Sequence, residues 1–278
     1  MTKKNIGCGN CYEEGYLVEK KGDLSTARIC NCVLECPECN GSGSILSKNE
    51  KAYIYISNCR ICGVIRRNVK LYNLSGVPAK YANVLQVDTF RPKGRNESQQ
   101  YALSYAKDFV KKYPNKKGFL LMGKAGLGKT HLAIGAISEL TLKKGIRCVF
   151  KDFFHLLSEL KEAYSQGTPE NEVLLPLIET EVLVIDELGK GRSSEWELNI
   201  LDQLISKRYN ASKITLITTN YVSEDYKQRK SSGHSSPNED QETLENRVGS
   251  RISSRLREMC EFIPIEGDDH RRTFQKRV

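Results

Sequence analysis

From Ser98 onward, short continuous apolar runs alternate with longer amphipathic stretches. Short apolar runs between helices are typical of strands in a parallel sheet that is covered on both faces, so the pattern predicts an α/β domain. We expect strands at residues 118–122, 146–150, 182–186, 214–219 and 260–265. We expect helices at residues 99–113, from 129 onward, and at 152–164, 170–179, 194–209 and 242–257.

The first 70 residues have a different character, because they are rich in cysteine, punctuated by glycine and poor in helical periodicity. We therefore expect a small β-rich domain at residues 1–70, a connector at 71–98 and the α/β domain at 99–278. A polar stretch at 227–241, KQRKSSGHSSPNEDQ, predicts a mobile loop.

Eight of the ten cysteines lie in this first region, in two copies of one pattern. CGNCYEEG is echoed by CPECNGSG about 28 residues later, and each copy is followed by a second close pair of cysteines. Four thiolates complete a tetrahedral Zn²⁺ site, so the repeat predicts two structural zinc ions. In sequential pairing the ligands are Cys8, Cys11, Cys30 and Cys32 for one ion, and Cys36, Cys39, Cys59 and Cys62 for the other.

Three alternatives to this scheme stay open. The pairs can interleave, the metal can be an iron–sulfur cluster because thiolates alone do not select zinc, or the cysteines can be buried without a metal. The formal charge of +9 falls to about +5 if two Zn²⁺ replace eight thiol protons. The chain stays basic, which is compatible with a phosphate-rich partner.

The hydrophobic runs are all shorter than the roughly 20 apolar residues of a membrane span. The amino-terminal MTKKNIGCGN has no apolar segment behind its basic residues, so we expect no signal peptide, no membrane association and a cytoplasmic location. A reducing cytosol also favours metal-bound thiolates over disulfides.

A nucleotide-binding motif follows the expected strand at 118–122. GKAGLGKT matches GxxxxGK[ST] and lies between a strand and a helix, where its backbone amides can wrap a β-phosphate. Lys129 is then expected to reach the β- and γ-phosphates of ATP, and Thr130 to bind Mg²⁺. The predicted nucleotide-binding residues are Gly123, Lys124, Ala125, Gly126, Leu127, Gly128, Lys129 and Thr130.

Two further motifs predict hydrolysis of the nucleotide. The strand VLVIDE ends in Asp186, expected at Mg²⁺, and Glu187, expected to polarise the attacking water. The next expected strand ends at Asn220, which we assign as a polar sensor of the γ-phosphate. Because a strand intervenes between the two phosphate motifs in the sequence, we expect the additional-strand class of P-loop protein.

The carboxy-terminal segment ENRVGSRISSRLRE is rich in arginine. An arginine donated to the γ-phosphate of a neighbouring subunit stabilises the charge of phosphoryl transfer. Arg247 is our first choice for this finger and Arg251 the second. Arg271, after the last expected strand, is the expected second sensor.

Together these segments resemble a known family. GKAGLGKTHLA, VLVIDELGKGRSSEWELNILDQLISKRYN, ITLITTNY and ENRVGSRISSRLREMC are similar to the DnaC/DnaI-type helicase-loader branch of AAA+ ATPases, close to the IstB transposition helpers. The resemblance covers about Leu74 to Arg272 and includes the connector GVPAKYANVLQVDTF. The cysteine-rich region departs from most members of this family.

The resemblance implies a five-stranded AAA+ core and an ATP-dependent homo-oligomer. It also implies engagement of a replicative helicase or another DNA-processing protein, and contact of single-stranded DNA with the helix near Phe153–Tyr164. The function that it favours is an ATP-dependent helper of DNA replication, with the helicase docked on the zinc module. Two alternatives are a transposition helper ATPase and an adaptor in which ATP switches a zinc module.

Overall fold

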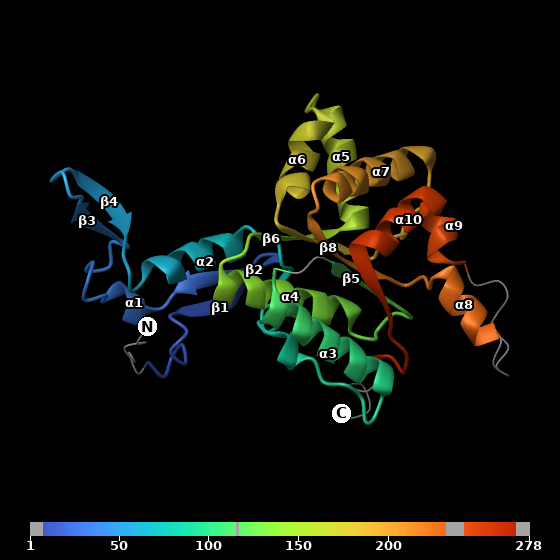
Figure 1. Cartoon of the computed structure of the whole chain (residues 1–278), viewed down its shortest axis with the longest axis horizontal. Helices are drawn as coiled ribbons and strands as arrows, with labels where there is room; N and C mark the ends of the chain where they lie inside the picture. Colours follow the sequence, from blue (N-terminus) through green and yellow to red (C-terminus); the bar gives the residue numbers. More distant parts are fainter. Residues whose placement is uncertain (1–7, 115–116, 232–241, 271–278) are drawn as a thin grey trace. The chain divides into compact units, whose positions relative to one another are not determined.

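The computed structural model describes residues 8–114, 117–231 and 242–270 (Figure 1). Contacts divide the chain into two compact units. The first contains the described residues up to Asn83 together with Ser138–Arg147, and the second contains Val84–Ile137 and the described residues from Cys148 onward.

The first unit contains two antiparallel hairpins and two complete helices, together with the end of helix α4 (Lys129–Lys144). In chain order these elements are β1 (Tyr16–Lys21), β2 (Leu24–Ile29), α1 (Asn31–Leu34), β3 (Ser44–Lys48), β4 (Ile54–Asn58) and α2 (Gly63–Asn73). Each copy of the cysteine repeat thus carries one hairpin between its two cysteine pairs, as a β-rich domain requires. Two 3₁₀ turns follow, η1 (Ala79–Tyr81) in this unit and η2 (Val87–Thr89) in the second unit.

Helix α2 was not predicted from the sequence of the first region, which we described as β-rich and poor in helical periodicity. It begins immediately after Cys62 and packs on β2. Val69 and Tyr72 lie on its buried face, whereas Arg66 is half-buried and Lys70 is exposed. Its apolar residues do recur at helical spacing, so the helix was missed because it directly follows the last cysteine pair, inside a region interpreted as β-rich.

The second unit contains the five-stranded parallel sheet that the resemblance implied. Its strand order is β6-β7-β8-β5-β9, and every neighbouring pair is parallel. The strands are β5 (Gly118–Met122), β6 (Cys148–Asp152), β7 (Val182–Asp186), β8 (Ile214–Thr219) and β9 (Cys260–Pro264). Strand β8 lies between β5 and β7, so the additional-strand arrangement is confirmed.

Helices cover both faces of this sheet (Figure 1). One face packs against α5 (Phe153–Ser165), α6 (Glu170–Glu179), α7 (Glu195–Asn210), α9 (Leu244–Val248) and α10 (Ser250–Met259), whose apolar side chains form one core with the sheet. The other face packs against α3 (Glu97–Lys112) and the first part of α4 (Lys129–Lys144). The ring of Phe109 on α3 lies edge-on to Phe119 on β5, with centroids 5.2 Å apart. None of the helices in the described residues is long and apolar enough to cross a membrane.

Two predictions near the carboxyl end were wrong. The helix expected at 242–257 is split into α9 and α10 by Gly249, whose φ of 82° interrupts the helix. The loop expected at 227–241 begins inside α8 (Glu224–Ser231), where acidic residues occupy the first turn and basic residues the last. The rest of that stretch, 232–241, lies outside the described residues.

Candidate nucleotide site and cysteine clusters

The glycine loop joins β5 to α4 at the carboxyl edge of the sheet. Gly126 and Gly128 have φ values of 80° and 85°, which side chains other than glycine rarely adopt. At Gly123 a Cβ atom would lie 2.1 Å from the carbonyl oxygen of Ile265, so only glycine fits there. The motif therefore needs its glycines for backbone reasons, as expected of a loop that wraps a phosphate.

Lys129 and Asn220 meet inside this loop. Lys129 is only 6% exposed, and its ammonium donates to the carbonyl oxygens of Gly123 and Lys124, each at 2.7 Å. It also donates to Oδ1 of Asn220 at 2.9 Å. Strands β5 and β8 are adjacent, and their ends bring together a cation and an amide that are 91 residues apart in the chain.

Thr130 and Asp186 form a second pair at the same edge. The Thr130 hydroxyl donates to Oδ1 of Asp186 at 2.8 Å, and the hydroxyl of Thr218 on β8 donates to the same oxygen. Burial raises the pKa of the Asp186 carboxyl, and the two hydroxyl donors oppose that rise. A hydroxyl and a carboxylate side by side are oxygen ligands that suit Mg²⁺.

Thr218 is a site residue that the sequence reasoning missed. It also accepts a hydrogen bond from the backbone N–H of Glu187 at 3.1 Å, so one hydroxyl orients both acidic residues. The available signal was weak, because Thr218 is one of three threonines in this fully buried strand. The strand order was needed to place it beside β7.

Glu187 directly follows β7 and has a φ of 54°, a left-handed conformation that sets its side chain apart from that of Asp186. Its carboxylate forms an ion pair with Lys190, and the side chain is 34% exposed. The hydrogen bond to Glu187 raises the pKa of Lys190, which stabilises the ammonium form of the lysine. The predicted water-polarising group is therefore accessible and held by a lysine three residues away.

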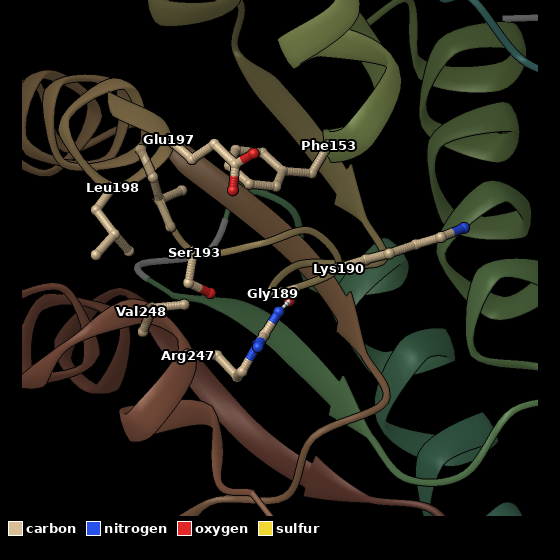
Figure 2. Close-up of a pocket in the computed structure, with 9 residues that line it drawn as sticks. Phe153, Gly189, Lys190, Ser193, Glu197, Leu198, Arg247 and Val248 are labelled. Atoms are coloured by element: carbon tan, nitrogen blue, oxygen red, sulfur yellow. Dashed lines mark hydrogen bonds between the residues drawn. The ribbon is translucent and has the colours of Figure 1, made fainter. Parts of the chain in front are cut away.

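Arg247 lies beside the loop that follows Glu187 (Figure 2). Its guanidinium donates to the carbonyl oxygen of Gly189 at 2.9 and 3.0 Å and to that of Gly191, and it lies 5.2 Å from the centroid of the Tyr221 ring. The side chain is only 14% exposed. Arg247 therefore contacts backbone of its own chain.

Two other arginines of the carboxy-terminal segment, Arg251 and Arg255, differ from Arg247 in their contacts. Arg251 is 73% exposed, with Nε 3.7 Å from a carboxylate oxygen of Asp202. Arg255, one turn later, binds the same carboxylate at 2.6 Å. Arg271 lies outside the described residues.

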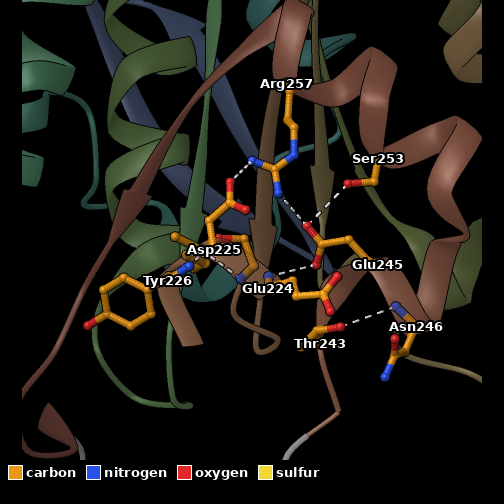
Figure 3. A network of polar contacts seen from close by, with 10 residues as sticks. Glu224, Asp225, Tyr226, Thr243, Glu245, Asn246, Ser253 and Arg257 are labelled. Atoms are coloured by element: carbon orange, nitrogen blue, oxygen red, sulfur yellow. Dashed lines mark hydrogen bonds and ion pairs between the residues drawn. The ribbon is translucent and has the colours of Figure 1, made fainter. Parts of the chain in front are cut away.

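A polar network joins the helices that carry these arginines (Figure 3). Arg257 on α10 binds Glu245 on α9 at 2.7 Å and also binds Asp225 on α8. Glu245 additionally accepts hydrogen bonds from the backbone N–H of Glu224 and from the hydroxyl of Ser253. The network ties α8, α9 and α10 together and so fixes the direction in which α10 presents Arg251.

The eight amino-terminal cysteines form two groups in the sequential pairing. Within each group all four sulfur atoms lie within 4.8 Å of one another, which is close enough for one metal ion. The groups are Cys8, Cys11, Cys30 and Cys32, and Cys36, Cys39, Cys59 and Cys62. The interleaved alternative would require sulfurs from both groups to meet.

Backbone amides next to the cysteines fit thiolate ligands. The N–H of Gly15 donates to the sulfur of Cys11 at 3.4 Å, and the N–H of Gly43 donates to Cys39 at 3.2 Å. Donors of this kind stabilise negative sulfur, and they occupy equivalent positions in both copies of the repeat. The donor set therefore fits two Zn²⁺ ions.

The phosphate loop, the carboxylate of β7 and the amide of β8 thus meet at the carboxyl edge of a parallel sheet, where α/β proteins bind their ligands. This order of strands and motifs is that of the AAA+ ATPases. The sequence model described as "IstB-like ATP binding protein" matches residues 64–277, and the chain belongs to this family. The match begins after Cys62, so both cysteine groups lie outside it.

Several relatives of known type are similar to this chain. The replicative helicase loader DnaC of Escherichia coli (strain K12) is 31% identical over 153 residues, which are 54% of this chain and 61% of DnaC. The match thus spans less than two thirds of that relative. A crystal structure of the DnaC helicase loader superimposes with a TM-score of 0.56 at 34% identity, covering 67% of this chain and 99% of the other. The crystal structure of DnaI, at 23% identity and a TM-score of 0.50, shows the same fold over 67% of this chain and 92% of DnaI.

Proposed function

We propose that this protein is an ATP-hydrolysing helper of DNA replication that acts as a helicase loader. The observation that carries the proposal is the meeting of Lys129, Thr130, Asp186 and Asn220 on an IstB-family fold that is similar to DnaC. These residues provide a counter-charge, two oxygen ligands and a sensor amide, which is the equipment of a nucleotide-driven switch.

Each of these residues has a separate role in ATP binding and hydrolysis. Lys129 exchanges its two loop carbonyls for phosphate oxygens when ATP binds, while Asn220 stays beside it as the sensor. Thr130 and Asp186 would hold Mg²⁺, which supplies charge neutralisation of the phosphates. Glu187 orients the attacking water once its carboxylate separates from Lys190.

We propose that the replicative helicase docks on the cysteine-rich module, residues 1–70, with two Zn²⁺ ions as its structural centres. The remaining regions are the connector, 71–98, and the ATPase domain, 99–278. The module lies almost wholly outside the family match, as expected for the part that selects a partner. The thiolate ligands suit the reducing cytoplasm, where we place the protein.

Single-stranded DNA is the second proposed partner. Phe153 is buried, but Phe154 and Tyr164 on α5 are 49% and 42% exposed. Lys161 lies 5.2 Å from the ring centroid of Trp196 on α7, and that ring packs edge-on against Tyr164. Exposed rings beside a lysine suit base stacking, so we place the DNA contact on Phe154, Tyr164 and Trp196.

The test uses the replicative helicase encoded in the same genome. The wild-type chain should bind the helicase in the presence of ATP and increase its loading on circular single-stranded DNA. Lys129→Ala should abolish the ATP-dependent loading without preventing folding. Failure of the wild-type chain to bind or load the helicase would contradict the proposal.

A second function, that of a transposition helper, is favoured by the description of the family to which the chain belongs. In that case the ATPase domain would act with a transposase. ATP-dependent binding to a transposase from the same genome, without binding to the helicase, would identify this function.

A further inference from the structure

The two copies of the cysteine repeat differ in what covers their hairpins. The β1–β2 hairpin packs against α2 and η1 within the first unit. The Tyr72 hydroxyl on α2 hydrogen-bonds the hydroxyl of Ser25 at 2.8 Å, and the side chain of Asn73 exchanges two hydrogen bonds with the backbone of Ala27. Ser25 and Ala27 are consequently buried, at 2% and 5% exposure.

The β3–β4 hairpin presents a corresponding apolar face to solvent. Leu46, Ile54 and Ile56 are 76%, 64% and 74% exposed. Leu46 lies directly opposite Ile56, and Lys48 lies opposite Ile54, so alternation along the strands places all four on one side of the sheet. We call Leu46, Lys48, Ile54 and Ile56 the hairpin face.

Such a face is costly to leave in water. Single exposed apolar residues are ordinary, but contiguous ones on a two-stranded sheet mark an interaction site. An isolated hairpin also gains little stability of its own, so its apolar side chains are not explained by the fold. In the first copy the equivalent surface has a helix on it.

We propose that the hairpin face is the docking surface of the first unit, and that it receives an amphipathic helix of the partner protein with acidic side chains along one edge. The inference rests on the proposed function, whose partner it describes. The repeat supplies the argument for a helix, because α2 fills this role on the first hairpin.

Charge supplies the argument for acidic side chains. Lys48 and Lys51 are exposed at the free end of the hairpin, where Glu50 in the turn is the acidic residue. At the base, Arg60 is exposed and Glu38 accepts a hydrogen bond from its backbone N–H, so the excess of positive charge lies at the free end, beside the hairpin face. A second copy of this chain would bring the same cations to the contact, and like charges facing one another disfavour that pairing. Aliphatic side chains also offer no stacking surface to a nucleic acid.

The experiment measures binding of the full-length chain to the replicative helicase by calorimetry. The double variant Leu46→Glu/Ile56→Glu should weaken binding by about 30-fold or more, because it places two charges at the centre of the contact. The control is Tyr55→Glu, which lies opposite Ser47 on the other side of the same hairpin, where affinity should change by less than about threefold. Nucleotide affinity and metal content show whether each variant is folded.

Two further measurements test the nature of the occupant. Lys48→Glu should weaken binding, and the loss should shrink as salt is added. Hydrogen exchange should map protection by the wild-type chain to an acidic helical segment of the helicase. Protection of a strand or loop, or a loss of single-stranded DNA affinity in place of helicase affinity, would overturn the proposal.

The remaining outcomes separate this inference from the proposed function. Helicase binding that is equal in wild type and double variant overturns the hairpin face and leaves the function intact. A change in the self-association of the chain alone overturns the proposed occupant. If the wild type binds neither the helicase nor a transposase, both the function and the inference fail.

Discussion

At the scale of single residues, Lys129 and Glu187 have separable tasks. Lys129 is buried in the phosphate loop, whereas Glu187 is partly exposed and bound to Lys190. We expect Lys129→Ala to weaken ATP binding by about 100-fold, because it removes a buried counter-charge to the phosphates. Glu187→Gln should keep the affinity within about threefold and slow hydrolysis by about 10²–10⁴-fold. Titration with a fluorescent ATP analogue and a steady-state phosphate assay check both. An equal loss of affinity in the two variants would show that Glu187 is misassigned.

The structural role of Arg208 could not be predicted from the sequence. This arginine is fully buried and donates to the carbonyl oxygens of Leu177 and Thr180 and to the hydroxyl of Thr215. Burial lowers the pKa of its guanidinium to about 9. In the sequence it is one more basic residue near a helix end. Its task of satisfying the last carbonyls of α6 depends on a contact some 30 residues away, which only the fold supplies.

At the scale of elements, each zinc site is expected to stabilise its own copy of the repeat. The two sulfur groups do not share a cysteine, so the protein should contain two Zn²⁺ per chain. Cys36→Ser should leave one ion per chain and unfold the second hairpin region, because metal binding is folding energy in so small a domain. Elemental analysis and hydrogen exchange measure this. Nucleotide affinity should be unchanged, and loss of both ions from this variant would show that the two sites do not fold independently.

The elements also show where sequence reasoning works. Strands β5, β7 and β8 and helix α6 have the predicted bounds. Each of the three strands is a fully buried run, whereas α6 buries only Leu174, Leu177 and Ile178 of its amphipathic sequence. The phosphate loop and Asp186 could also be predicted from the sequence, because each belongs to a motif of consecutive residues. Thr218 and Trp196 were missed because their neighbours are brought by other strands and helices.

At the scale of the whole molecule, the proposed arginine finger requires a second copy of the chain. Arg247 contacts the carbonyl oxygens of Gly189 and Gly191, so it must exchange these partners to reach a neighbour's phosphate. Arg251 is already exposed on α10, and Asp202 is the acidic partner near it. If Arg247 is the finger, it must therefore release the loop after Glu187 when two subunits assemble.

Mixing inactive variants tests this arrangement. Arg247→Ala and Lys129→Ala should each lack hydrolysis, but a mixed interface contains one complete site, so activity should partly return on mixing and rise with protein concentration. A finger can contribute about 10³–10⁵ in rate, which makes even partial recovery measurable. Arg255→Ala, which removes a side chain already bound to Asp202, is the matched control and should retain most activity alone. If Arg247→Ala alone hydrolyses ATP at the wild-type rate, Arg251 becomes the finger. If mixing restores nothing, Arg247 acts within its own chain, by holding the backbone of Gly189 and Gly191 beside Glu187.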